Sequence, residues 1–187
     1  AARQQLRLGA TQVKVMASGG VMSSTDELES VQFTVEEMQA AVYEASMAGK
    51  YVLAHCHTSP SVNNALAAGV RSIEHGSILD EATARRILEQ SAFMVPTMLV
   101  MEFLAKSAEA GGLSHYSEMK LEQVRTKIPA SVELAAHVGV PLGSGTDILG
   151  ARQSGRGAEL ALKAKILGPM KAIISATGTN AQLFRLE

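Results

Sequence analysis

The sequence predicts an α/β fold in which parallel strands alternate with helices, as in a (β/α)8 TIM barrel. The first observation is a short apolar run followed by a helical pattern, repeated about five times along the 187 residues. Such alternation is typical of a parallel sheet with crossover helices. The second is that three of these runs end in ligand-type residues: His55 and His57, then His75, then Asp147. A (β/α)8 barrel builds its active site at the C-terminal ends of its strands, so the motifs lie where that fold places a site.

Each expected strand is a short, mostly apolar run between turn residues. These runs lie at residues 12–17, 51–55, 70–74, 92–96 and 140–144. Helical patterns lie at residues 3–9, 35–48, 60–68, 81–90, 114–138, 157–167, 169–176 and 179–184. Thr34 and Glu37 form a capping-box pattern before one helix, and Asp80 is placed to cap another. Gly49 and Gly69 supply helix stops.

Three further segments carry less regular patterns. Residues 18–24 form a loop rich in small residues, where backbone can approach a ligand closely. Residues 97–113 are ambiguous, since two consecutive glycines near their end would break a helix. Pro129 could kink or break the long helix expected at 114–138.

Composition narrows the function classes. The chain is 47% hydrophobic with a formal net charge of -1, an ordinary globular composition that gives no reason to expect nucleic acid or an acidic membrane as a partner. No apolar run approaches the roughly 18 residues of a membrane span. The lone cysteine, Cys56, excludes an internal disulfide and is compatible with a reducing compartment, which slightly favours the cytoplasm.

The chain is short for a complete barrel, which usually needs about 250 residues. Both ends fall inside helical patterns, at Ala1 and at Glu187, as if a longer protein had been cut. Five strands cannot close an eight-stranded barrel and would leave sheet edges uncovered. We therefore expect residues 1–187 to be the C-terminal part of one barrel domain.

The residues at the strand ends indicate a metal site. Histidine and carboxylate side chains together suit a zinc-type metal, and His55, His75 and Asp147 supply both kinds. Lys14 lies near the end of an earlier run. Each residue alone has an ordinary structural explanation: a hydrogen-bonded core histidine, a lysine extending to solvent, or a helix-capping aspartate. Their repetition at successive strand ends favours ligands.

Several stretches together carry a family resemblance. They are residues 13–21, 54–57, 69–76, 145–147 and 167–181. In these stretches the chain resembles the amidohydrolase superfamily, in its Xaa-Pro dipeptidase (prolidase) and imidazolonepropionase-like branch. The resemblance implies a barrel of the metal-dependent hydrolase type, of which this chain covers about strands four to eight, with the N-terminal strands and a small β-sandwich absent.

The resemblance also implies a role for each matching residue. Lys14 would be carbamylated and bridge two divalent metals, by default two zinc ions per active site. His55 and His75 would ligate the second metal. Asp147 would ligate one metal and take the proton from the bridging water, and His57 would contact the substrate carboxylate. One departure is that no His-X-His motif of the family's first strand precedes Lys14, which truncation would explain.

The function implied is hydrolysis of an amide or peptide C–N bond by a metal-activated hydroxide. The substrate would be a small molecule, such as a dipeptide cleaved in the manner of an Xaa-Pro dipeptidase or carboxypeptidase, and the protein could form a homo-oligomer. Three alternatives remain. Lys14 could form a Schiff base in a lyase, a mononuclear deaminase could use the same fold without a bridging lysine, or the fragment could be a non-catalytic binding module.

Overall fold

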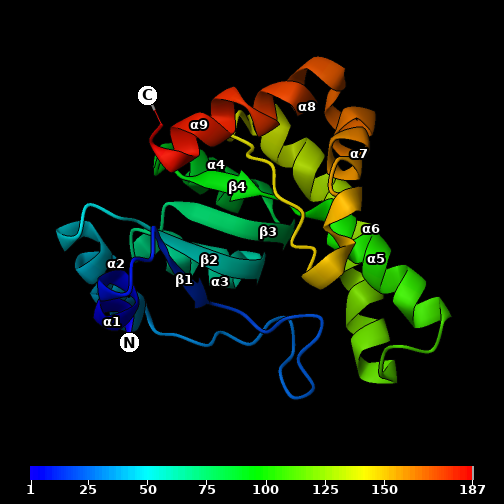
Figure 1. Ribbon diagram of the computed structural model, residues 1–187, viewed down its shortest axis with the longest axis horizontal. Helices are drawn as coiled ribbons and strands as arrows, with labels where there is room; N and C mark the ends of the chain where they lie inside the picture. Colours follow the sequence, from blue (N-terminus) through cyan, green and yellow to red (C-terminus); the bar gives the residue numbers. More distant parts are fainter. Residues whose placement is uncertain (187) are drawn as a thin grey trace.

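The computed structural model describes residues 1–186, apart from the side chains of Ala151 and Arg152. At its centre is a parallel sheet whose strands pair in the order in which they occur along the chain (Figure 1). The strands are β1 (Val13–Met16), β2 (Val52–Thr58), β3 (Ser72–Ile78) and β4 (Phe93–Val95). Neighbouring strands that follow one another in sequence are the arrangement found in a (β/α) barrel.

One helix precedes β1, and helices follow each strand. They are α1 (Ala2–Arg7), α2 (Val35–Met47), α3 (Ser59–Ala67), α4 (Glu81–Glu89), α5 (Met98–Glu109), α6 (His115–Val138), η1 (Gly150–Gly155), α7 (Ala158–Leu167), α8 (Pro169–Ala176) and α9 (Gly178–Phe184). The expected capping box forms at Thr34 and Glu37, and Asp80 accepts from the backbone N–H of Thr83 at 2.7 Å. The ambiguous segment is mostly helix α5, and α6 continues through Pro129.

The expected strand at 140–144 is the main difference from the sequence prediction. It runs parallel to β4 as a single bridge between Met94 and Leu142, with Gly143 donating its N–H to the Met94 carbonyl at 2.9 Å. On the other side of this run, the side chain of Asn180 hydrogen-bonds to both the N–H and the carbonyl of Ser144, each at 2.9 Å. A side-chain amide therefore pairs with the backbone at the end of the run.

The two faces of the sheet have different chemistry. One face packs against α2, α3, α4 and α6 through a core that includes Val52, Ala54 and Cys56 of β2. Cys56 is fully buried, and burial raises the pKa of its thiol to about 12. Alternate residues of a strand face opposite sides, so His55 and His57 point to the other face, where they line a pocket.

A second apolar cluster joins the loop after β1 to helices α5 and α6. Its buried members are Val21 and Leu28 of the loop, Met101 of α5, and Leu121 and Val124 of α6. The loop therefore packs beside the helix pair at one end of the sheet (Figure 1). No helix within residues 1–186 is both long and apolar enough to span a bilayer.

Candidate metal centre

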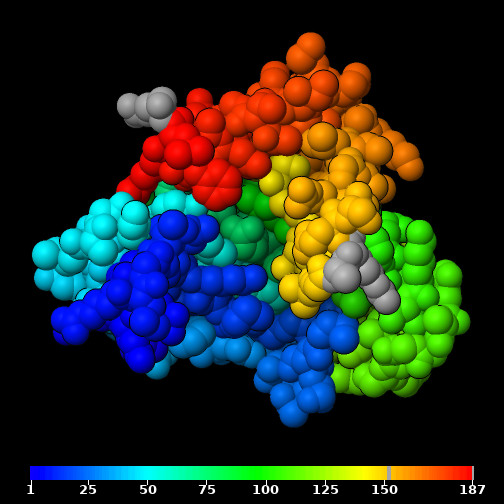
Figure 2. All heavy atoms as spheres, in the orientation of Figure 1, coloured from blue at the N-terminus to red at the C-terminus, as the bar shows by residue number. Residues whose placement is uncertain are grey.

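The C-terminal ends of the strands open into a pocket of about 590 Å³. All five residues predicted from the sequence line it: Lys14, His55, His57, His75 and Asp147. Figure 2 shows this side of the molecule hollowed between the N-terminal part of the chain, in blue, and the segment that begins near residue 145, in yellow. The structure thus brings together every predicted site residue.

Three histidines form the centre of the pocket. His55 and His57 come from β2 and His75 from the adjacent β3, and one ring nitrogen from each lies within 4.8 Å of the others. All three side chains are buried, and their ring centroids are 4.5–4.9 Å apart. The strand expected at 51–55 is longer in the structure, because β2 extends through Thr58 and places His57 inside the strand.

A backbone irregularity brings His75 into this cluster. His75 has a φ of 75° and Gly76 a φ of 54°, and the pairing of β2 with β3 shifts register at this point. The positive φ of Gly76 favours glycine there, and a Cβ would also lie 2.9 Å from the terminal methyl of Met94, which would have to move. Positive φ at a non-glycine residue is sparsely populated and concentrates at functional sites.

Hydrogen bonds fix which nitrogen each ring can offer. The His55 Nε2 lies 3.2 Å from the Gly19 carbonyl oxygen, which can only accept, so this nitrogen carries the proton and Nδ1 has the lone pair. The His57 Nδ1 lies 3.0 Å from the Ser77 hydroxyl, and the His75 Nδ1 lies 2.6 Å from the Thr97 hydroxyl. These contacts are of the kind that orient metal-binding histidines.

The remaining nitrogen of His75 is the clearest sign of a ligand. Its Nε2 is buried and has no hydrogen-bond partner among the described residues. Burial lowers the pKa of His55, lowers the pKa of His57 to about 3, and holds the pKa of His75 well below its usual value. Neutral imidazole is the metal-binding form. An unsatisfied buried nitrogen beside two other neutral rings therefore fits a divalent metal.

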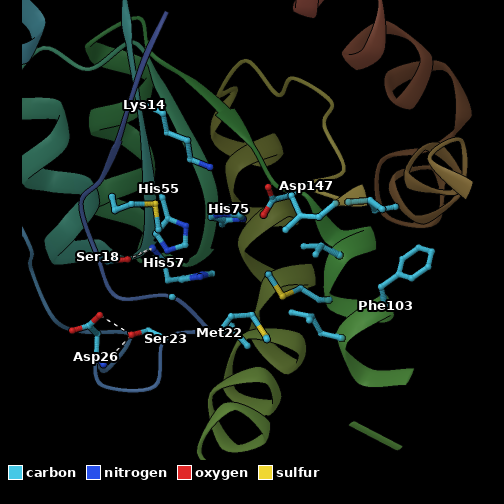
Figure 3. Close-up of a pocket in the computed structure, with 18 of the residues that line it drawn as sticks. Lys14, Ser18, Met22, Ser23, Asp26, His55, His57, His75, Phe103 and Asp147 are labelled. Carbon is cyan, nitrogen blue, oxygen red and sulfur yellow. Dashed lines mark hydrogen bonds between the residues drawn. The ribbon is translucent and has the colours of Figure 1, made fainter. Parts of the chain in front are cut away.

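Lys14 and Asp147 approach the histidines from two sides, as Figure 3 shows. Lys14 belongs to the edge strand β1 and Asp147 to the loop after the 140–144 run, and both residues are exposed. Asp147 has a φ of 54°, and its negative charge acts to raise the pKa of His55, whereas the charge of Lys14 acts to lower it. The short helix that follows Asp147 has Leu149 at its N-cap, so the aspartate is not used as that cap.

Glu74 is a further titratable residue of β3 and lies next to His75 in the sequence. It accepts from the Ser72 hydroxyl at 2.5 Å, and burial raises its pKa to about 7. Glu74 pairs with His55 in the register of β2 and β3, and the charges of Lys14 and Asp147 both act on its pKa. Strict alternation would place Glu74 and His75 on opposite faces, but the positive φ of His75 breaks that alternation.

The residues that support the site from a distance were missed in the sequence. Thr97 binds His75, and Ser18 accepts from the backbone N–H of His57 at 3.1 Å. Thr97 directly follows the 92–96 strand, and a polar residue at a strand end was the available signal. Two fully buried lysines, Lys120 and Lys163, hold backbone carbonyls of the loops beside the pocket. No local pattern marks either of them.

Comparison with known proteins identifies the family. The Amidohydrolase family profile matches residues 1–187. Ochratoxinase from Aspergillus niger is 36% identical over 184 residues, which are 98% of this chain and 38% of that protein. The chain belongs to the amidohydrolase family, as the resemblance predicted.

Solved structures agree with this assignment. A prolidase complexed with N-methylphosphonate-L-proline superposes with a TM-score of 0.95 and 39% identity, covering 100% of this chain and 46% of that one. An Xaa-Pro dipeptidase with methionine bound in its active site superposes with a TM-score of 0.92 and 32% identity. The match covers 99% of this chain and 46% of that one. The chain thus spans less than half the length of these relatives. The predicted α/β fold, part of a TIM barrel, is confirmed.

Proposed function

We propose that this chain forms part of a metal-dependent hydrolase that cleaves an amide or peptide C–N bond in a small substrate of the dipeptide type. The observation that carries the proposal is the buried, unpartnered Nε2 of His75 inside a cluster of neutral histidines. Further support comes from the pocket that the cluster shares with Lys14 and Asp147. The similar prolidase binds a phosphonate analogue built on proline, and the similar ochratoxinase is a second relative from the same family.

Four side chains would hold the metal. His55 would bind through Nδ1 and His75 through Nε2, since their other nitrogens are engaged with Gly19 and Thr97. Lys14 would bind as a carbamate, an anionic oxygen ligand that could bridge two zinc ions, and Asp147 would complete the set. Metal at this position would supply Lewis acidity, which lowers the pKa of a water molecule and polarises the scissile carbonyl.

The remaining steps belong to side chains of the chain itself. Asp147 would take the proton of the attacking water and pass it to the leaving nitrogen. His57 would contact the substrate carboxylate, because its Nδ1 faces the Ser77 hydroxyl and its Nε2 is left to donate into the pocket. Both roles use atoms that line one cavity.

The test combines metal content with turnover in the full-length protein. We expect about two metal ions per chain by elemental mass spectrometry, and hydrolysis of dipeptides such as Xaa-Pro. Asp147→Asn should lower kcat by about 10²- to 10⁴-fold and keep most of the metal. Asp80→Asn is the matched control, because Asp80 caps α4 and asparagine is an equally good cap.

Other outcomes would overturn the proposal. Absence of metal together with unchanged turnover in Asp147→Asn would exclude metal-dependent hydrolysis. Trapping of a carbonyl substrate on Lys14 by borohydride, in a reaction indifferent to chelators, would instead establish the Schiff-base lyase. Loss of metal in Asp147→Asn would show that ligation is the main role of that residue.

A further inference from the structure

Helix α6 places a lysine at the loop that follows β1. The Lys120 ammonium group donates to the carbonyl oxygens of Gly20 at 2.9 Å, Ser23 at 2.6 Å and Asp26 at 2.9 Å. The whole residue is 1% exposed. An ammonium group has three N–H donors and no acceptor, so these contacts satisfy it completely.

Burying the Lys120 ammonium group costs free energy unless its hydrogen-bond partners are well placed. A buried ammonium group loses its hydration, and only well-placed partners compensate for the loss. Burial lowers the pKa of Lys120, while the negative charges of Glu27 and Asp26 act to raise it. Within the described residues no carboxylate forms a salt bridge to Lys120. The charge is therefore held by the loop backbone, supplemented by the Tyr116 ring 4.2 Å away.

The loop that Lys120 holds is part of the metal centre. The Gly19 carbonyl fixes the His55 ring through Nε2, and the Ser18 hydroxyl accepts from the backbone N–H of His57. Met22 and Ser23 line the same pocket (Figure 3). The three carbonyls bound by Lys120 thus lie in the stretch of backbone that orients His55 and walls the pocket.

We propose that Lys120 is a positioning residue, which fixes the loop 18–26 so that its Gly19 carbonyl orients His55 and its side chains form one wall of the pocket. The apolar contacts of Val21 and Leu28 with α6 bring the loop to the helix, but such contacts are non-directional. The three charged hydrogen bonds set its register. The part of this proposal that concerns His55 as a metal ligand rests on the proposed function. The part that concerns the position of loop 18–26 does not.

The first experiment measures the loop alone. Lys120→Met keeps the length of the side chain and removes its donors, and Lys127→Met on the exposed side of α6 is the matched control. By hydrogen–deuterium exchange of the full-length protein, peptides covering 17–30 should exchange at least about tenfold faster in Lys120→Met. Peptides of β2 and β3 should be unchanged. Unchanged loop exchange, or an equal rise throughout the sheet, would overturn the proposal.

The second experiment connects the loop to the site. Zinc affinity, measured by competition with a chelating dye, should fall several-fold in Lys120→Met, because His55 loses the partner that orients it. It should stay at the wild-type value in Lys127→Met. Loop exchange that rises without any change in zinc affinity would overturn the link to His55. If the proposed function is wrong, the wild-type protein itself will show no hydrolysis of dipeptides, which is a separate result from any change in Lys120→Met.

A second variant keeps the test decisive if Lys120→Met fails to fold. Lys120→Arg retains the charge, but its planar fork cannot donate to three carbonyls that converge on one point as an ammonium group does. We expect intermediate loop exchange and intermediate zinc affinity. Wild-type values for both in Lys120→Arg would show that charge alone is sufficient and that the three-carbonyl geometry is not the cause.

Discussion

The pocket has a strand-borne part and a loop-borne part, and the two are held in different ways. His55, His57 and His75 extend from strands inside a parallel sheet, with the helix layer packed on its opposite face. The loop-borne parts are residues 18–26 and 143–149, and helices distant in sequence hold them through a few polar groups. We infer that the strand-borne groups are fixed by the sheet, whereas each loop depends on a small number of hydrogen bonds.

The two loop-borne parts, called here the first flank (residues 18–26) and the second flank (residues 143–149), also differ from each other. Lys120 holds the first flank through three carbonyls. On the second flank, the neutral amide of Asn180 pairs with Ser144. Lys163 donates to the Gly143 carbonyl and to the Ser175 hydroxyl. One charged side chain, Lys120, therefore ties the first loop to a distant helix, whereas Asn180 and Lys163 both tie the second, so a single substitution should disturb the second loop less.

The largest effect should follow from His75→Asn, which tests the strand-borne part. Asparagine tolerates the positive φ of position 75, so the backbone can keep its conformation. We expect metal affinity to fall by at least about 100-fold, since loss of a ligand exceeds the usual cost of losing its supporting partner. Elemental analysis after dialysis measures this. His137→Asn, at an exposed position of α6, should retain wild-type metal content. Wild-type metal content in His75→Asn would show that His75 is not a ligand.

The next effect should come from Thr97→Val, which removes the hydroxyl beside His75 Nδ1 and preserves the shape of the side chain. Loss of such a partner typically lowers metal affinity by about 10- to 100-fold. Chelator competition provides the measurement. Thr83→Val is a matched control, because Thr83 is equally buried and accepts from Asn63 away from the pocket. Equal losses in the two variants would point to general destabilisation instead.

This division between strands and loops also explains how much could be predicted from the sequence. The strand ends were predictable because apolar runs bounded by turn residues define them, and ligand-type residues stand directly at those ends. His55, His57 and His75 were found in this way, and the structure gathers them. Their metal-binding and substrate-binding roles stay predictions.

The rest depends on contacts between distant residues. Lys120 and Gly20 are 100 positions apart, and Asn180 and Ser144 are 36 apart. Neither pair leaves a periodic or local signal. The run at 140–144 was predicted as a strand from its apolar character, and the structure forms a single parallel bridge there, with a side-chain amide from α9 bonded to the backbone at its end. The consecutive glycines that made residues 97–113 ambiguous lie just beyond the end of α5.

The second flank can be tested through Asn180. Asn180→Leu removes both hydrogen bonds to Ser144 and leaves half-buried backbone groups without these partners, which should lower the free energy of unfolding by about 1–3 kcal/mol. Asn180→Asp retains the acceptor for the Ser144 N–H and loses the donor, so its loss should be smaller. Denaturant unfolding of the wild type and both variants measures these differences in the free energy of unfolding. Zinc affinity should stay close to wild type in both, because among the described residues the hydrogen bonds of Asn180 go to Ser144 and none joins it to a histidine. A larger loss in Asn180→Asp than in Asn180→Leu would contradict this account.

The last effect concerns the charge of Lys163 and appears only when the pH is varied. Burial lowers its pKa to about 8 from the usual 10.5, so between these pH values the unfolded chain binds a proton that the folded chain has released. Stability attributable to this group therefore rises with pH across that window, by up to about 1.4 kcal/mol per pH unit. Lys163→Met lacks the titrating ammonium group, whereas all other titratable groups are the same in the wild type and the variant. The difference between the two proteins therefore isolates the contribution of Lys163. The difference in unfolding free energy, wild type minus variant, should increase between pH 8 and pH 10. A constant or decreasing difference would mean that Lys163 keeps its proton in the folded state. The second flank would then rest on a buried charge, as the first does.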